Sequence, residues 1–280
     1  MTERQQHRRR RGAGVAAGVL CVCLAGSGCV AESGAAVDDS RDGDAVQVVR
    51  RAADVLAGAR SSKARTSMEM ATGGTRVTIR GEGVYDFRRQ VGRLKVLLPQ
   101  DPAGAPAQRP IVELLAPGAL FMKNRGAGVP ADKWVRVETR SLSDGNLVTG
   151  GATDPYAAAE VLRGARTAKY VGEEEVAGTA VRHYRGKADL RVAAREASDG
   201  NAESLAAAAK GFATDEVPFD VYLDDEGRIR KVRHRFSFVN GQQQSAVAVA
   251  STTLLYDFGA PVDVRLPDGD DIYAGKIAEE

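Results

Sequence analysis

Apolar and polar side chains alternate most regularly between residues 217 and 239, in the segment VPFDVYLDDEGRIRKVRHRFSFV. Phe219, Val221 and Leu223 alternate with more polar neighbours, and this period of two is that of a strand with one buried face. The sequence DDEG at 224–227 then supplies turn chemistry. The segment therefore predicts a β-hairpin, and because an isolated hairpin is only marginally stable, it also predicts a larger sheet.

Segments with strand character occupy most of the remaining chain. They are short, apolar at every second position or throughout, and separated by turns that contain Gly or Pro. Because strands joined by short turns pair antiparallel, we expect one antiparallel sheet. Besides the two strands of the hairpin, the expected strands are 64–70, 75–87, 94–98, 111–115, 119–123, 133–138, 167–175, 179–190 and 246–256.

Three segments have helical character. The first, 45–59, has apolar residues at helical spacing and follows Asp44, which has the chemistry of an N-cap. The second begins with the Asp-Pro pair at 154–155, a typical helix start. The third, 192–212, is rich in alanine, and the sequence DGN at 199–201 predicts a break in it. We expect an α+β fold in which the first helix lies on the concave side of a curved sheet.

The first residues have the pattern of a secretory signal peptide. Basic residues from Arg8 to Arg11 precede a short apolar run at 15–25, which is too short to span a bilayer. Small residues directly precede Cys29, as in a bacterial lipobox, where the cysteine is lipidated and becomes the mature N-terminus. Gly26 stands where such a motif usually has Leu, so ordinary secretion with cleavage nearby is the alternative.

These features predict three parts of the chain. Residues 1–28 form the signal peptide, and the small, polar and acidic segment 29–44 forms a flexible tether. Residues 45–280 form a single domain of ordinary length for a large β fold. We expect this domain to be extracytoplasmic and anchored to the outer face of the cell membrane by the lipid on Cys29.

Removal of the signal changes the charge balance. The 280 residues include 39 basic and 37 acidic side chains, of which residues 1–28 hold five Arg and one Glu. The mature chain therefore has 39 minus 5, or 34, basic residues and 37 minus 1, or 36, acidic residues, a net charge of −2. This balance gives no support for nucleic-acid binding. All three cysteines lie at or before Cys29, so the domain has no disulfide.

The chain lacks the motifs of common catalytic sites. It has no Gly-x-Ser-x-Gly elbow, no P-loop and no His-Glu-x-x-His sequence. After the signal only His183 and His234 remain, in separate expected strands and without a third ligand, so we expect neither a metal site nor a cofactor. Acidic clusters at 173–175 and 268–271 are typical of solvated turns. We therefore expect a binding protein and not an enzyme.

The expected strand 75–87 carries excess apolar surface on one face. Gly81 and Gly83 lie on that face and either bend the strand or open space beside it. Because the covering helices are rich in alanine, we expect an apolar cavity, and Gly83→Phe should fill it and block lipid uptake while leaving the fold intact. The expected lining residues are Val77, Ile79, Gly83, Tyr85, Phe87, Leu94, Val96 and Met122.

A basic stripe follows the second strand of the hairpin. Lys231, Arg233 and Arg235 occupy alternate positions and therefore share one face. This stripe is suited to the headgroups of anionic lipids, and the alternative is a solvated sheet face without a ligand.

Five segments, in this order, resemble the LppX/LprG family of actinobacterial lipoproteins. They are KWVRV at Lys133–Val137, DPYAAAEVL at 154–162, YVGEEEVAGTAVRHYRGKADL at Tyr170–Leu190, VPFDVYLDDEGRIRKV at Val217–Val232 and YDFGAPVDVRLP at Tyr256–Pro267. The resemblance implies a LolA-like, half-open β-barrel whose strongly curved antiparallel sheet wraps a few helices and an apolar cavity. It also implies binding of acylated lipids or glycolipids for transport across the envelope, with a membrane transporter as a candidate partner.

Two binding functions follow from these expectations. The first is a cell-envelope lipoprotein that holds a lipid or another hydrophobic ligand in the cavity. The alternative is an envelope sensor or scaffold that uses the same cleft to bind a protein segment, and a filled or collapsed cavity would favour it. An enzyme is disfavoured by the missing catalytic motifs.

Overall fold

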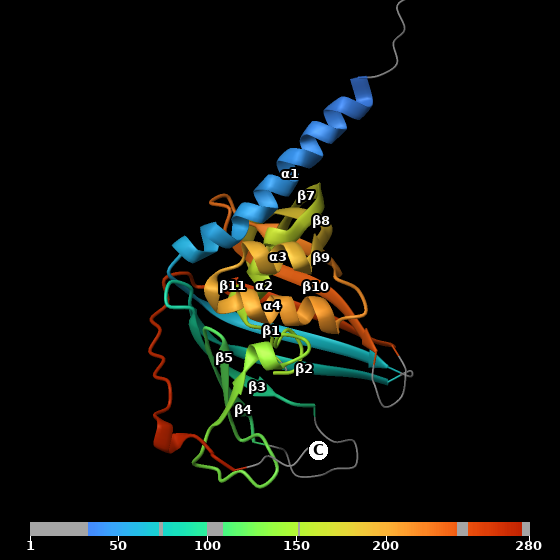
Figure 1. The fold of residues 1–280 in the computed structure, drawn as a ribbon. Helices are drawn as coiled ribbons and strands as arrows, with labels where there is room; N and C mark the ends of the chain where they lie inside the picture. Colours follow the sequence, from blue (N-terminus) through green and yellow to red (C-terminus); the bar gives the residue numbers. More distant parts are fainter. Residues whose placement is uncertain (1–32, 73–74, 100–108, 151, 240–245, 276–280) are drawn as a thin grey trace, which may run out of the picture.

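The structure of the protein is a computed structural model (Figure 1). It describes residues 33–72, 75–99, 109–150, 152–239 and 246–275. The signal segment and Cys29 lie outside these ranges, so the predicted lipidation remains a prediction.

The described strands form one antiparallel sheet of 11 strands in the order β6-β5-β4-β3-β2-β1-β11-β10-β9-β8-β7. The chain runs from the centre to one edge at β6, starts again at the other edge with β7, and returns to pair β11 with β1. Since β6 and β7 do not pair, the sheet is open. The expectation of one antiparallel sheet is confirmed. The strands are β1 (Ser61–Thr72), β2 (Thr75–Asp86), β3 (Val91–Leu97), β4 (Ile111–Ala116), β5 (Ala119–Lys123), β6 (Val135–Glu138), β7 (Ala165–Val176), β8 (Thr179–Asp189), β9 (Glu216–Leu223), β10 (Ile229–Val239) and β11 (Ala246–Tyr256).

The described α-helices lie on one face of this sheet, which we call the inner face (Figure 1). The main hydrophobic core lies between the two layers and joins Val49 and Leu56 of the first helix to Leu94 and Phe219 of the sheet. Each of these fully buried side chains contributes on the order of 1.5–3 kcal/mol, so this single core stabilises both layers together. The helices are α1 (Ser33–Gly58), α2 (Pro155–Val161), α3 (Leu190–Glu196) and α4 (Asp199–Gly211).

Two helix predictions need correction. Helix α1 begins at Ser33 instead of after Asp44, so residues 33–44, expected to be part of a flexible tether, are helical. The break in the third helical segment falls at 197–198, before the DGN sequence, because Ser198 adopts an extended conformation (φ −61°, ψ 155°) and Asp199 starts α4. The start of α2 is as expected, since the Asp154 carboxylate accepts hydrogen bonds from the backbone N–H of Tyr156 and Ala157.

The C-terminal segment covers part of the opposite face, which we call the outer face. Val264 packs with Leu114 and Phe121 in a second, small core. Further along, the backbone N–H of Trp134 donates to the carbonyl of Asp271 at 2.8 Å. This segment therefore shields β4 and β5 from solvent and leaves the outer face of the central strands uncovered by any described helix.

Candidate functional site

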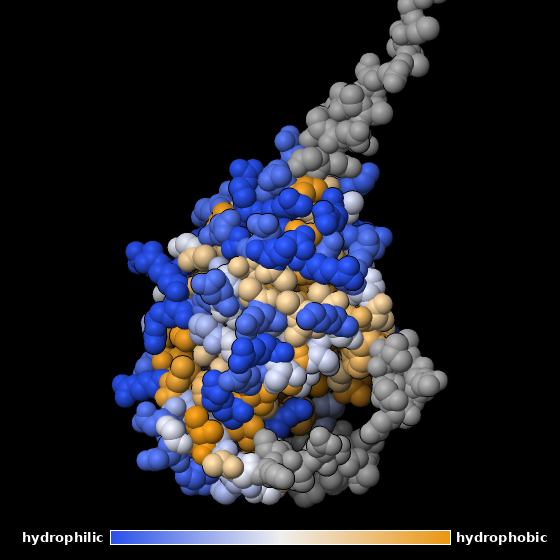
Figure 2. Space-filling model, viewed as in Figure 1, coloured by the Kyte–Doolittle hydropathy of each residue, from blue (hydrophilic) through white to orange (hydrophobic). Residues whose placement is uncertain are grey.

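A cavity of about 620 Å³ opens at the end of the inner face that lies below α4 in Figure 1. This lower half of the molecule shows more hydrophobic surface than the hydrophilic end around α1 (Figure 2). The walls combine aliphatic side chains from the sheet and two loops with three polar side chains. The aliphatic side chains are Ile79 of β2, Ile111 of β4, Leu98 and Val129, and the polar ones are Arg109, Asn124 and Arg125.

The loop 124–131 forms one wall of this cavity, and its sequence explains its shape. Asn124 and Gly126 have positive φ values of 63° and 102°, which Asn and Gly adopt more readily than other residues. The side-chain amide of Asn124 donates to the carbonyl oxygen of Pro110 at 2.9 Å and ties the loop to the start of β4. As a result, Val129 packs against the main core and Arg125 lies at the cavity wall.

Glu113 is the buried polar group nearest in sequence to this wall. It faces the main core two residues after Ile111, opposite Met122 of β5, and is 0 % exposed. Neither carboxyl oxygen has a hydrogen-bond partner among the described residues. Burial raises the pKa of Glu113 to about 8, against a smaller opposing effect of Arg125. The carboxyl group is therefore protonated at neutral pH and carries an unused O–H donor.

The eight expected cavity residues lie mostly in the core and not around open space. Only Ile79 of that set lines the cavity at the end of the sheet. Val77 is half-buried against the main core, and Met122 is 7 % exposed within it. Tyr85, Phe87, Leu94 and Val96 are at most 1 % exposed and belong to the same core.

The expectation that Gly83 opens space on the inner face is wrong. A Cβ atom on Gly83 would overlap the carbonyl oxygen of Arg93 and lie 3.0 Å from the Cα of Leu94. Strands β2 and β3 thus approach each other so closely here that only glycine fits. This close approach of two strands is a third explanation for Gly83, beside the bend and the open space that the sequence suggested.

Residues 144–150 and 152–154, to which the sequence pattern assigned no buried position, enter the interior on the inner face. Leu147 and Thr153 are fully buried there. Ala152 lies where a side chain on Gly81 would point, because a Cβ atom added to Gly81 would be 3.2 Å from the Cβ of Ala152. The Asp144 carboxylate shapes the loop by accepting hydrogen bonds from backbone N–H groups, including that of Val148 at 2.8 Å. The volume expected above β2 is therefore occupied by protein.

The basic stripe of β10 lies on the outer face, and its charges have partners. Arg235 donates to Asp220 at 2.9 Å, and Arg233 lies 3.9 Å from Glu69. Lys231 lies over the ring of Tyr222, 4.6 Å from its centroid. Binding of an anionic headgroup by this stripe would have to compete with these contacts.

The two histidines serve the packing of the sheet. His183 lies between Glu174 at 2.7 Å and Asp220 at 2.9 Å and stacks on Tyr222. His234 is buried on the inner face, and burial lowers its pKa to about 3, so it is neutral. Within the described ranges, no group of three or more His, Cys, Asp or Glu side chains is arranged to hold a metal ion. None of the described helices is both long and apolar enough to cross a membrane.

Several residues of the cavity were not singled out from the sequence. Arg109, Arg125 and Val129 belong to loops, where spacing gives no information about what they face. Glu113 carried a usable signal, because it is the lone charged residue in the apolar run IVELL of β4. Its inward position follows from the alternation of that strand.

Comparisons with known proteins give a likeness in fold. No family model matches the chain, and no curated protein matches it in sequence. The crystal structure of LprF from Mycobacterium bovis is 14 % identical, covers 82 % of this chain and 99 % of its own, and has a TM-score of 0.40. The lipoprotein LppX of Mycobacterium tuberculosis is 10 % identical, with 80 % of this chain and 100 % of its own covered and a TM-score of 0.44. A putative outer membrane lipoprotein-sorting protein domain from Vibrio parahaemolyticus is 9 % identical, with 78 % of this chain and 94 % of its own covered and a TM-score of 0.32.

At these low sequence identities the structural comparisons show a similarity in fold alone.

Proposed function

We propose that the protein is an extracytoplasmic lipoprotein that binds a lipid or another hydrophobic ligand in the cavity at the open end of the inner face. The observation that carries this proposal is the cavity itself. Its volume of about 620 Å³ lies within the range of roughly 300–1,000 Å³ typical of small-molecule sites. Its aliphatic walls suit an acyl chain, since each buried methylene contributes about 0.8 kcal/mol.

The polar side chains of the cavity give the ligand an orientation. Arg109 and Arg125 offer guanidinium groups at the same cavity as Ile79 and Ile111. Arginine binds carboxylate and phosphate groups with paired hydrogen bonds, so the ligand class is an acyl lipid with an anionic or polar headgroup. In this arrangement the acyl chain contacts the aliphatic wall and the headgroup remains near the two arginines.

The wider role follows from the proposed location of the protein outside the cell membrane. A sheet that wraps the ligand like a half-open barrel, on a protein anchored outside the membrane, is suited to carry a lipid or glycolipid between envelope layers. Catalysis plays no part in this role, because binding and release of the ligand are sufficient.

Val129→Trp tests the cavity directly. The larger ring should fill space beside Ile111 and weaken binding of a fluorescent acyl lipid by about tenfold or more, a loss of roughly 1.4 kcal/mol. The matched control is Val171→Trp on β7, where Val171 is 50 % exposed and remote in sequence from the cavity. Binding is measured by fluorescence titration, with circular dichroism as the folding control. Equal binding by the two folded variants would place the ligand elsewhere.

Cys29→Ala tests the anchor. Without the thiol no lipid can be attached, so we expect the protein to be released into the medium or to accumulate as an unprocessed precursor. The measurement is fractionation of cells followed by mass determination of the N-terminal peptide. A membrane-bound, processed Cys29→Ala protein would exclude lipidation at this position.

One observation favours the second candidate function, the binding of a protein segment. The inner face above β2 is packed with the protein's own side chains, such as Ala152 and Leu147, in place of a large apolar cavity. Native mass spectrometry of the purified protein, with extraction of bound lipid, separates the two functions. Co-purifying lipid supports the lipid carrier. The absence of lipid, together with unchanged binding of the fluorescent acyl lipid by Val129→Trp, supports the scaffold.

A further inference from the structure

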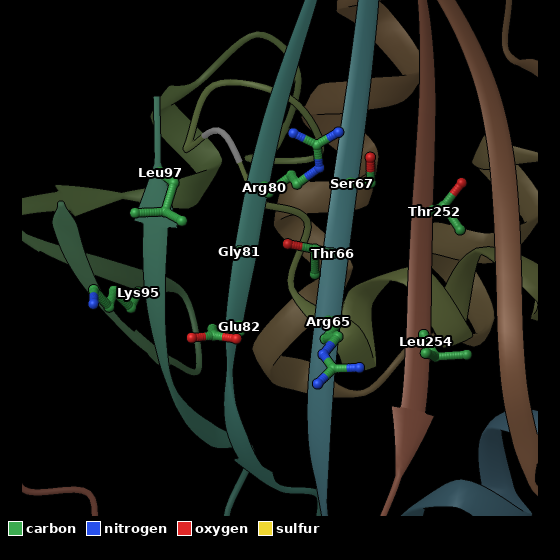
Figure 3. Close-up of a pocket in the computed structure, with 10 residues that line it drawn as sticks. All are labelled: Arg65, Thr66, Ser67, Arg80, Gly81, Glu82, Lys95, Leu97, Thr252 and Leu254. Carbon is green, nitrogen blue, oxygen red and sulfur yellow. The ribbon is translucent and has the colours of Figure 1, made fainter. Parts of the chain in front are cut away.

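A second hollow lies on the outer face of the sheet, opposite the helices (Figure 3). It has a volume of about 360 Å³ and crosses four adjacent strands, β3, β2, β1 and β11. The sheet alternation explains its lining, because Gly81 and Thr66 belong to the inner face and their neighbours point outward. We call it the outer groove, and its outward side chains are Arg65, Ser67, Arg80, Glu82, Lys95, Leu97, Thr252 and Leu254.

The outer groove is both cationic and apolar. It is lined by three basic side chains and one acidic side chain. Leu97 is 47 % exposed, one of few large apolar side chains with such exposure among the described residues. The aliphatic stems of Arg and Lys can extend the apolar wall while their charged ends stay in water.

Arg80 is the central charge of the outer groove. Its cross-strand neighbours are Ser67 on β1 and Leu97 on β3, so no acidic side chain lies directly opposite it. Figure 3 shows Arg80 extending from β2 toward β1. Among the described residues it has no ion-pair partner, in contrast to Arg235 of the basic stripe, which is paired with Asp220.

Glu82 reduces the positive charge without removing it. It is opposite Arg65 on β1 and Lys95 on β3 in the strand register, yet forms no ion pair with either within 4.0 Å. Arg65 instead lies over the ring of Tyr256, 4.9 Å from its centroid. Counted together, the four charged side chains leave the groove with a net charge of +2.

We propose that the outer groove binds the headgroup of an anionic phospholipid and so seats the outer face of the sheet on a membrane surface. The uncompensated guanidinium of Arg80 is complementary to a lipid phosphate. Leu97 beside Arg80 and Leu254 beside Arg65 add apolar surface that suits the glycerol and upper acyl region. A soluble anion would gain nothing from these leucines, and the lining has no aromatic side chain on which a nucleic-acid base would stack.

This inference goes beyond the proposed function and does not depend on it. The outer groove and the cavity of the inner face lie on opposite faces of the same sheet and share no lining residue. A protein that seats itself on a membrane through one face keeps the other free to exchange a ligand. The two sites can therefore be tested separately.

The test is vesicle binding by residues 33–280, which contain every described element of the sheet and its core. The vesicles contain phosphatidylcholine with or without phosphatidylglycerol, and binding is measured by co-sedimentation at low and at physiological salt. We expect binding to the anionic vesicles only, weakened by salt. The double variant Arg65→Glu, Arg80→Glu should bind more than about tenfold more weakly. Glu82→Gln should bind more tightly, because it removes the one opposing charge.

The matched control is Arg195→Glu, Lys210→Glu, which makes the same change in net charge on exposed positions of α3 and α4. It should bind like the wild type. An equal loss in this control, equal binding to neutral vesicles, or full displacement by inorganic phosphate would each overturn the proposal. Leu97→Ser keeps every charge of the outer groove and removes apolar surface beside Arg80, so it should weaken binding to the anionic vesicles. Unchanged vesicle binding by this variant would contradict the proposal that a lipid occupies the outer groove.

Discussion

Gly83→Phe is expected to prevent the protein from folding, and even Gly83→Ala should lower the free energy of unfolding by about 3 kcal/mol. The reason is the close approach of β2 and β3, where a Cβ would overlap the carbonyl oxygen of Arg93. That atom is backbone within a strand pair, so it cannot move aside as a flexible side chain would. Any side chain at 83 must push β3 away from β2 and break their pairing near Leu94.

Urea denaturation of Gly83→Ala, followed by circular dichroism, measures this cost. Gly58→Ala is the matched control, because no atom lies within 4 Å of the added Cβ at the end of α1. Its stability should stay within about 0.5 kcal/mol of the wild type. A Gly83→Phe protein that folds with wild-type stability would contradict the close approach, and would restore Gly83 as a cavity position.

The strands were predictable because their signal is local. In β3 the alternation of Leu94 and Val96 with charged neighbours appears directly as alternating burial. Burial also alternates in β10, where Val232 and Phe236 are buried, but in β9 the polar positions Asp220 and Tyr222 are buried as well. The turn between these strands has a glycine with φ of 77° at Gly227. Antiparallel neighbours joined by short turns then determine most of the strand order. Two pairings join strands that other elements separate in the chain: β8 pairs with β9 across the helices α3 and α4, and β1 pairs with β11 near the other end of the chain. The sequence carries no local signal for either pairing.

The site was less predictable, because it depends on contacts between distant segments. Alternation places Gly83 on the inner face but cannot reveal that the Arg93 backbone occupies the space beside it. Similarly, Leu147 lies in a glycine-rich loop without periodicity, and only the tertiary structure places it in the core. The predicted excess of apolar side chains was real, but the protein's own loop packs against it.

The outer groove shows the same limit for charged residues. Arg80 and Arg235 both alternate on strands and look equivalent in the sequence. Only the register separates them, since it places Ser67 and Leu97 beside Arg80 and brings Arg235 to Asp220. Which surface cation remains available to a ligand is therefore a property of the sheet and not of one strand.

Glu113 should make the protein less stable as the pH rises toward 8. Its pKa is about 8 in the folded protein and near 4.5 in the unfolded chain, and the first cause is burial. Between these values the folded protein keeps a proton that the unfolded chain has released. The stability is therefore fully present below about pH 4.5 and falls by about 1.4 kcal/mol per pH unit until the folded carboxyl ionises.

Two other buried groups, Asp154 and His234, affect stability mainly below pH 6.5. Burial raises the pKa of Asp154 to about 6, so its effect on stability ends near that pH. Burial lowers the pKa of His234 to about 3, so it affects stability only below its ordinary value of 6.5. Neither Asp154 nor His234 contributes a fall between pH 6.5 and 8, and Glu113 should lower the free energy of unfolding there by roughly 2 kcal/mol.

Glu113→Gln should abolish this fall, because the amide stays neutral at every pH while occupying nearly the same volume. The measurement is urea denaturation at half-unit steps between pH 6.5 and 8, for the wild type and the variant. Glu196→Gln on α3 removes an exposed carboxylate as the matched control and should keep the wild-type slope. A flat wild-type profile, or an unchanged slope in Glu113→Gln, would mean that Glu113 is already ionised in the folded protein. It would then need a partner for its two carboxyl oxygens, and Arg125, whose charge already opposes the shift in its pKa, would be the side chain to replace next.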